Sequence, residues 1–271
     1  MSVVGSTVTG MATLPNPLPR LAADPSGRSL GLELPLGRLV HETDDGPWHE
    51  PLLWHGTYAA SPGAWTALGG APAARVGLLP VLIEVGDGQG GPEDWELIPG
   101  EVSYPGDHDA EEVLAEYWEE YTEDEWPGLA PARALTAGSD ARAAEVADSL
   151  VADGSRLKDP RLALVPARRS ADIPAAIGWS GPLNHENDVA RLCAVLRSWE
   201  DRFGIRVVAL TFDRLVLSVA APPTTVEEAE AVAVEHSAFC PDSVPQGSRE
   251  ALRAYAESTV LGRREWGFRW D

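Results

Sequence analysis

The segment NHEND, residues 184–188, gathers residue types that could do chemistry. It holds a histidine, two carboxylates and two amides directly before a segment with helical spacing. An imidazole beside a carboxylate can carry a proton or bind a metal ion, and the N-terminus of a helix offers N–H donors to an anion. We therefore take His185 and Glu186 as candidate catalytic residues, and Asn184 and Asn187 with them as candidate ligand-binding residues.

A purely structural interpretation of the same segment stays open. Asn187 and Asp188 would cap the free N–H groups of the following helix, and Asn184 would close a turn. His185 and Glu186 would then lie in solvent and have no role.

His236 and Cys240 stand one helical turn apart, which would suit a thiolate paired with an imidazole or half of a metal site. Both positions fall on the apolar stripe of a predicted helix, however, and no further ligand follows nearby. The sequence favours a packed thiol and a buried histidine with a backbone partner.

Two groups in the first half are dense in potential ligands for a hard cation. They are His41, Glu42, Asp44, Asp45, His49, Glu50 and His55, and then Asp107, His108 and Asp109. Neither group has a zinc spacing such as HExxH, and ordinary acidic loops have the same composition. We predict no metal site and no cofactor. The nucleotide motif GxxxxGK[ST] and the serine elbow GxSxG are also absent from the sequence.

The periodicity of apolar residues predicts a chain in two parts. Residues 1–30 read as a mobile leader, residues 31–152 as a smaller acidic α/β region, residues 153–160 as a linker and residues 161–271 as one domain. The acidic region should hold short strands near 30–40 and 51–57, a buried strand at 77–85, and helices near 64–68, 107–125 and 139–152.

The second part is predicted to be an α+β, ferredoxin-like βαββαβ sandwich with an extra helix before the last strand. Strands are expected at 161–167, 205–212, 214–220 and 264–271, and helices at 170–179, 188–203, 225–240 and 248–260. Gly204 should end the long helix, since it accepts a positive φ. In the last strand Trp266, Phe268 and Trp270 alternate with other residues, which predicts one aromatic face.

Most of the formal net charge of −21 lies in the first half. Residues 161–271 hold 15 acidic and 13 basic residues, whereas residues 1–160 hold 27 and 8. Such a surface repels phosphate backbones and anionic lipid, so we expect neither nucleic acid nor membrane as a partner. It favours a basic protein, or high solubility alone. We find neither a signal peptide nor an apolar run long enough to span a membrane, and we expect a cytoplasmic protein.

The second part also resembles a known family. PLNHEND, VLRSWEDRFG, AVAVEHSAFCPD and the closing WGFRWD are similar to the bacterial domain of unknown function numbered 4253, over about residues 161–271. The acidic stretch from EVSYPGDHD to EYTEDEW resembles what precedes that domain in longer members. The resemblance implies no activity, cofactor or catalytic residue.

Two hypotheses of function follow from the sequence, which does not indicate an oligomeric state. The leading one is a non-catalytic cytosolic binding protein that engages a basic protein partner through its acidic N-terminal region. The alternative is a metal-assisted hydrolase around His185 and Glu186, with acids of the first half closing the site. A sensory domain that binds a small ligand between helix and sheet is a third possibility.

Overall fold

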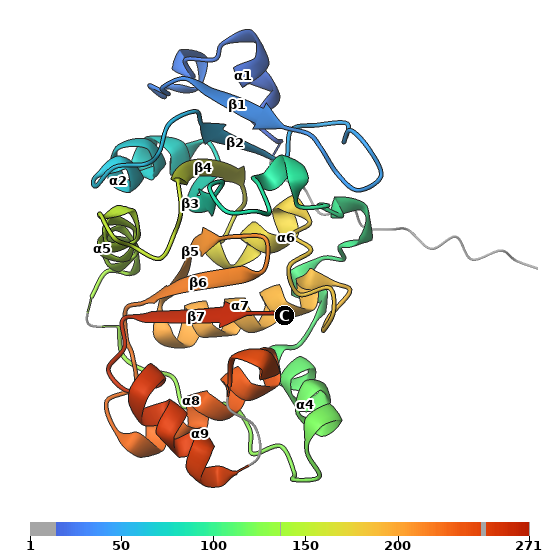
Figure 1. Ribbon diagram of the computed structural model, residues 1–271, viewed down its shortest axis with the longest axis vertical. Coiled ribbons are helices and arrows are strands. Elements are labelled where there is room, and N and C mark those ends of the chain that lie inside the picture. Colours follow the sequence, from blue (N-terminus) through green and yellow to red (C-terminus); the bar gives the residue numbers. More distant parts are fainter. Residues whose placement is uncertain (1–14, 136, 245–247, 271) are drawn as a thin grey trace, which may run out of the picture.

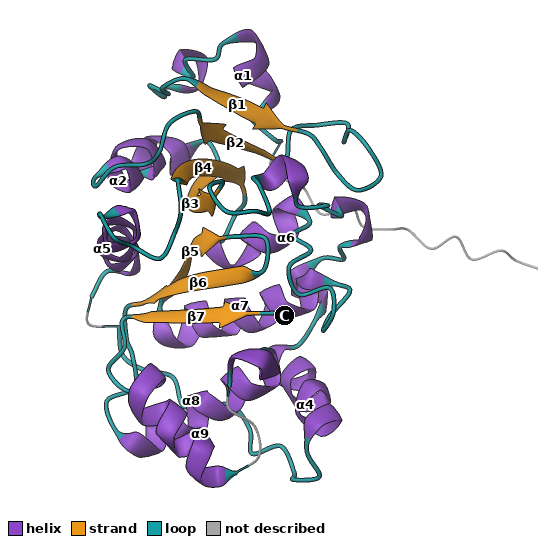
Figure 2. Cartoon of the chain, viewed as in Figure 1, coloured by secondary structure: helices purple, strands orange, loops and turns teal. Residues whose placement is uncertain are grey.

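A seven-stranded mixed sheet forms the centre of the computed structural model, which describes residues 15–135, 137–244 and 248–270. Helices lie on both faces of this sheet (Figures 1 and 2). In sheet order the strands are β1 (Gly37–Val40), β2 (Leu53–Gly56), β4 (Pro160–Pro166), β3 (Leu78–Glu84), β5 (Ile205–Leu210), β6 (Arg214–Val219) and β7 (Glu265–Arg269). The α-helices are α1 (Pro19–Ala23), α2 (Ala64–Gly69), α3 (Ala71–Arg75), α4 (Ala110–Tyr121), α5 (Ser139–Val151), α6 (Ile173–Ile177), α7 (Val189–Phe203), α8 (Val226–Phe239) and α9 (Arg249–Tyr255), which a π-helical turn, Ala256–Val260, extends.

The α+β class is confirmed, but the strand order is not that of a ferredoxin-like sandwich. In that sandwich the first strand of the second part, β4, would lie inside the sheet of its own four strands. Here β3, from the first half, pairs with β4 on one side and with β5 on the other. The β3–β5 pair is parallel and the other pairs are antiparallel. β3 is buried along nearly its whole length, which is typical of a central strand. The periodicity of apolar residues predicts a buried strand here but does not indicate which strands lie beside it.

The two faces of the sheet carry different helices. On one face, α7 and α8 pack their apolar residues against Leu217 of β6 and against the aromatic side chains of β7. On the other face, α2 and α5 pack against Leu82, Ala209 and Val216. Alternate residues of one strand therefore enter two cores, as a pleated strand requires.

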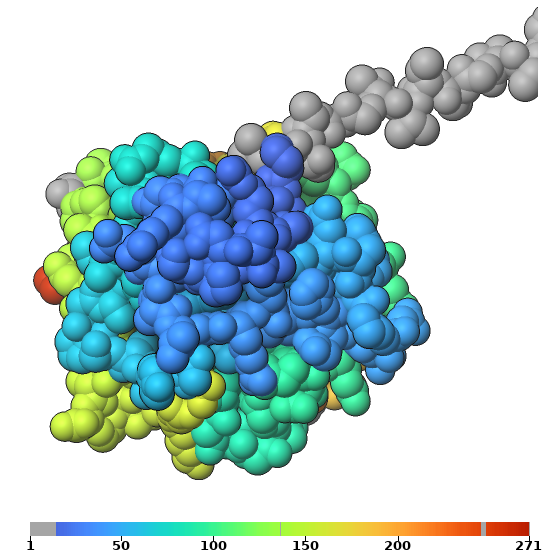
Figure 3. Space-filling view, turned by 90° about the horizontal axis from the view of Figure 1, so that it is seen from above, coloured from blue at the N-terminus to red at the C-terminus, as the bar shows by residue number. Residues whose placement is uncertain are grey.

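Residues 15–30 are folded rather than part of a mobile leader. Leu18, Leu21 and Leu30 are buried against Trp54 of β2 and Leu164 of β4. In the space-filling view from above, this segment (dark blue) covers the end of the molecule (Figure 3). Its three buried leucines outweigh the Pro and Gly content that suggested a leader, because each buries an apolar side chain worth about 2 kcal/mol. Residues 1–14 lie outside the described residues.

Most other elements lie where the pattern placed them. Asp188 caps α7, Gly204 ends it with φ 64, and Thr225 and Glu228 form a capping box on α8. The prediction of an aromatic strand at the end of the chain is confirmed. β7 pairs with β6, and its Trp266 and Phe268 are at most 2% exposed.

No helix within the described ranges combines the length and the apolar character that crossing a bilayer requires.

Candidate functional site

The NHEND loop lies between α6 and α7 and packs against α4, a helix of the first half. Asp188 accepts a hydrogen bond from the backbone N–H of Ala190 at 3.1 Å and so starts α7, as expected. Asn184 and Asn187 lie at the surface. His185 and Glu186, in contrast, turn inward and contact the aromatic stripe of α4, so neither is simply solvated.

Glu186 is held by three donors. The hydroxyl of Tyr117 donates to Oε2 at 2.5 Å, and Nη1 of Arg191 lies 3.2 Å from the same oxygen. The backbone N–H of Asp188 donates to Oε1 at 2.8 Å. The guanidinium of Arg191 also lies over the Tyr117 ring, 5.2 Å from its centroid. The Glu186 side chain is only 9% exposed, so this carboxylate joins α4 to α7 rather than facing an open cavity.

His185 packs on the same aromatic side chains. Its Nδ1 lies 3.1 Å from the hydroxyl of Tyr121, and its ring lies 4.8 Å from that of Tyr117. Its Nε2 is buried without a hydrogen-bond partner among the described residues. Burial lowers the pKa of His185 from its ordinary value of 6.5. The imidazole is therefore mainly in its neutral form at neutral pH.

The tyrosines of α4 are weak acids in this cluster. Burial and the hydrogen bond to Glu186 raise the pKa of Tyr117 well above its ordinary value of 10.0. Burial also raises the pKa of Tyr121. Tyr117 is therefore a permanent hydrogen-bond donor to Glu186, and the cluster is a set of paired groups rather than a nucleophile with its base.

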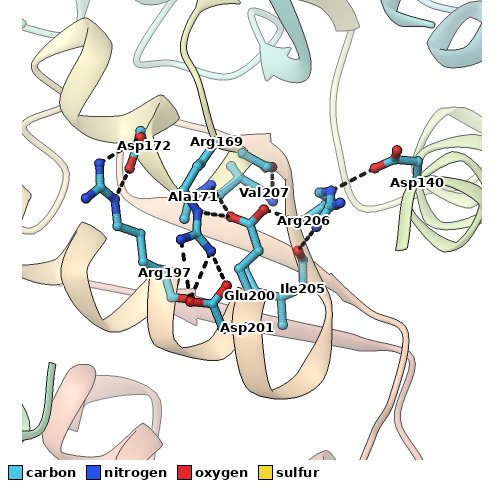
Figure 4. A network of polar contacts seen from close by, with 11 residues as sticks. Asp140, Arg169, Ala171, Asp172, Arg197, Glu200, Asp201, Ile205, Arg206 and Val207 are labelled. Atoms are coloured by element: carbon cyan, nitrogen blue, oxygen red, sulfur yellow. Dashed lines mark hydrogen bonds and ion pairs between the residues drawn. The ribbon is translucent and has the colours of Figure 1, made fainter. Parts of the chain in front are cut away.

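Ion pairs along α7, the helix that begins directly after the NHEND loop, hold it in place (Figure 4). Arg197 binds Asp172 at 2.5 Å and Arg169 binds Asp201 at 2.5 Å. At the far end, Arg206 bridges Glu200 of α7 and Asp140 of α5. These contacts hold the helix against both neighbours, so the loop at its N-terminus has a defined position.

A buried carboxylate joins α7 to α8. Both oxygens of Glu235, a fully buried side chain, bind the Arg202 guanidinium at 2.6 and 2.8 Å. Trp199 Nε1 and the backbone N–H of Ala130 also donate to it. A buried charge with four such donors is fully satisfied, and it is a structural rather than a reactive group.

His236 and Cys240 are both buried, and each is bonded inside the protein. His236 Nδ1 lies 3.1 Å from the hydroxyl of Tyr255, so its partner is a side chain and not the expected backbone group. Burial lowers the pKa of His236 to about 3 and raises that of Cys240 to about 12. A thiol with so high a pKa is unreactive at neutral pH.

The two histidine and acid groups of the first half do not converge. Within the described ranges, no cluster of three or more His, Cys, Asp or Glu side chains is arranged to hold a metal ion. His55 is buried in β2, where its Nε2 accepts a hydrogen bond from Arg38 at 2.8 Å. His108 contacts Ser103, and Asp109 caps α4. These residues therefore make separate structural contacts on different elements.

Sequence reasoning did not find Tyr117, Tyr121 and Arg191 as neighbours of the NHEND loop. The helical stripe placed the two tyrosines on one face of α4, and Arg191 follows Asp188 in the first turn of α7. The missing information was tertiary, namely that α4 and α7 pack together.

Comparison with curated proteins and with solved structures gives no match for this chain. A scan against family models gives one, which covers less than half of the chain and begins with β4. Residues 161–271, which contain the NHEND loop and β7, match the family of the domain of unknown function DUF4253.

Proposed function

We propose that the chain is a non-catalytic, cytoplasmic binding protein that engages a basic protein partner through the exposed face of α4 and the residues that follow it. The supporting observation is a group of carboxylates at the C-terminal end of this helix, which we call the α4 acidic end. It consists of Glu119, Glu120, Glu123, Asp124 and Glu125, all of them exposed.

The α4 acidic end is electrostatically unfavourable for the helix itself. Carboxylates stabilise the N-terminus of a helix and destabilise its C-terminus, where the dipole is negative. Glu116 and Glu120 also repel each other at the i, i+4 spacing. Within the described part of the chain none of the five carboxylates forms an ion pair, whereas Glu116 does, with Arg191. An arrangement that costs folding stability is understandable if a cationic partner neutralises it.

The geometry gives less support to the metal-assisted hydrolase. A metal ion at Glu186 would have to displace Tyr117 and Arg191 from a carboxylate that is already buried and bonded. His185 would also have to open its contact with α4, because its Nε2 is buried.

A matched pair of charge variants tests the proposal. One variant changes Glu119, Glu120, Glu123 and Glu125 to Gln. The control changes four exposed acids of the same half, Glu33, Asp45, Glu50 and Glu101, to the corresponding amides. Both lose the same net charge. Each chain is immobilised and used to capture proteins from lysate at about 50 mM and about 500 mM salt, and the captured partner is then purified for affinity measurements.

The expected result is one basic partner that binds the unmodified chain and the control at low salt, binds about tenfold more weakly to the α4 variant, and is lost at high salt. Equal loss of binding in both variants would assign the effect to net charge. A partner that is indifferent to salt, or the absence of any partner, would overturn the proposal.

A further inference from the structure

The strand β7 has a free edge. It lies at the end of the sheet, and β6 is its one partner among the strands that the structure describes (Figure 1). The backbone N–H of Trp270 donates to Asp213, and that of Val219 donates to the carbonyl of Arg264. In an antiparallel ladder, hydrogen-bonded and non-hydrogen-bonded positions alternate. The backbone groups of Glu265, Gly267 and Arg269 therefore point away from β6.

These outward groups differ in how they are satisfied. At Arg269 the side chain of Ser243 bonds both the N–H, at 2.7 Å, and the carbonyl, at 3.1 Å. The outward backbone groups of Gly267 and Glu265 have no hydrogen-bond partner among the residues that the structure describes. An exposed edge with unpaired N–H and C=O groups is a template for a further strand.

A groove of about 680 Å³ lies between this edge and α9, and we call it the β7 groove. Gly267 forms part of its floor, and a Cβ atom added there would meet nothing within 4 Å. The opposite wall is made by α9 and its extension, where the small side chains of Ala251, Ala254 and Ser258 lie beside Tyr255. The open floor and the low wall leave room for an extended segment beside β7.

The β7 groove is basic although the protein is strongly acidic. Arg156, Arg214 and Arg269 line it, with side chains between 42% and 52% exposed. Arg156 forms an ion pair with Glu265, and Asp213 lies within ion-pair distance of both Arg214 and Arg269. A second depression, which begins at Glu265, is lined by Arg142, Arg263 and Arg264. The acidic residues that line the two hollows are Glu145 and Glu265. The surface around the free edge therefore carries an excess of positive charge.

We propose that the β7 groove binds an extended acidic peptide segment of a partner protein, which adds to the sheet beside β7. Its backbone pairs with the unpaired groups of Gly267 and Glu265, and its carboxylates lie against Arg156 and Arg214. A nucleic acid fits less well, because its sugar–phosphate backbone lacks the peptide N–H and C=O groups that would pair with the edge of β7. A second copy of the chain fits less well, because pairing of two β7 edges would bring the groove arginines of both copies together.

Peptide selection on the full chain tests this inference. A phage-displayed library of random heptapeptides is selected on the unmodified chain and, in parallel, on the Gly267→Val chain. The branched side chain occupies the floor of the groove, and the position can accept it because the space is open. Enriched peptides are then synthesised and their binding is measured by fluorescence anisotropy.

The expected peptides are rich in Asp and Glu and bind the unmodified chain at least about tenfold more tightly than the Gly267→Val chain. An Arg156→Gln, Arg214→Gln double variant weakens them to a similar extent and lowers the salt dependence of binding. Arg75→Gln, which removes an exposed arginine of α3, leaves binding unchanged.

Several outcomes would overturn the inference. They are a selection without enrichment, enriched peptides that are basic, and peptides that bind both chains alike. A poly(dT) oligonucleotide whose binding depends on the two arginines but not on Gly267 would assign the groove to nucleic acid. A dimer in sedimentation that Gly267→Val converts to monomers would assign the edge to a second copy.

Discussion

The NHEND loop and the β7 groove both bring polar groups of several elements together, but they differ in whether the central group, Glu186 or the backbone of Gly267, is already paired. In the loop, Glu186 is bonded by Tyr117, by Arg191 and by the backbone of Asp188. In the groove, the arginines have carboxylate partners, but the outward backbone groups of Gly267 have no partner among the described residues, and the space above this glycine is open. A cluster of potentially reactive residues in the sequence therefore does not indicate that their side chains are free to bind a ligand. Changes at the loop should alter stability, and changes at the groove should alter binding.

The largest effect is expected for Glu186→Ala. It leaves the buried hydroxyl of Tyr117 without its acceptor and removes the more buried of the two carboxylate partners of Arg191, which should lower the free energy of unfolding by about 3 kcal/mol. Urea denaturation followed by tryptophan fluorescence measures it. Glu116→Ala is the control, because Glu116 also binds Arg191 but is 64% exposed, and its loss should be below about 1 kcal/mol. Equal small losses for both would mean that the loop does not join α4 to α7.

The next effect is a dependence of the free energy of unfolding on pH, which His236 causes. This histidine contacts the hydroxyl of Tyr255, a residue that lines the β7 groove. The pKa of His236 is about 3 in the folded protein, below its ordinary value of 6.5, because the imidazole is buried. Above about pH 6.5 the residue is neutral in both states and contributes no slope. As the pH falls below that value, only the unfolded chain takes up the proton, so stability is lost by up to about 1.4 kcal/mol per pH unit.

Denaturant unfolding at pH values from about 8 to about 5 checks this slope against a His236→Phe, Tyr255→Phe double variant. The second change removes the hydroxyl that would otherwise lose its partner. The variant should show a flatter loss of stability below about pH 6.5, whatever its stability at pH 8. Parallel curves for the two proteins would contradict the burial of a neutral His236.

The sequence predicted the elements of the fold better than their arrangement. The caps at Asp188 and Thr225 and the alternation of aromatic residues in β7 are local signals, and each is borne out. The insertion of β3 between β4 and β5 depends on pairing between distant segments, for which a single sequence holds no signal. The same reason explains the error at residues 15–30, whose leucines find their apolar partners only on β2 and β4.

For the candidate site, too, the sequence indicated the local structure but not the contacts between distant segments. NHEND was visible as a helix start with unusual chemistry, but whether Glu186 was free depended on Tyr117, 69 residues away. The β7 groove had no visible signal. Its arginines come from separate segments of the sequence. Its central residue is Gly267, which leaves the floor of the groove open because it has no side chain.

A smaller effect is expected for Tyr117→Phe. It removes one donor from Glu186 but leaves Arg191 and the backbone of Asp188 in place, so the free energy of unfolding should fall by about 1 kcal/mol. In a double-mutant cycle with Glu186→Gln the coupling should be about 1 kcal/mol. Tyr58→Phe is the control, because Tyr58 is 69% exposed and should change stability by less than about 0.5 kcal/mol. A coupling near zero would mean that the short hydrogen bond contributes nothing.

The smallest effect on stability is expected for Gly267→Val, and it separates the two regions most directly. A side chain at this position meets open space, and valine favours a strand, so the free energy of unfolding should change by no more than about 0.5 kcal/mol. Gly88→Val, in an exposed loop where an added Cβ also meets nothing, is the matched control. Thermal unfolding should not distinguish the two variants, but only Gly267→Val should lose the acidic peptides selected on the unmodified chain. A marked loss of stability at Gly267 alone would mean that the groove is closed in solution, and the contrast with the NHEND loop would then disappear.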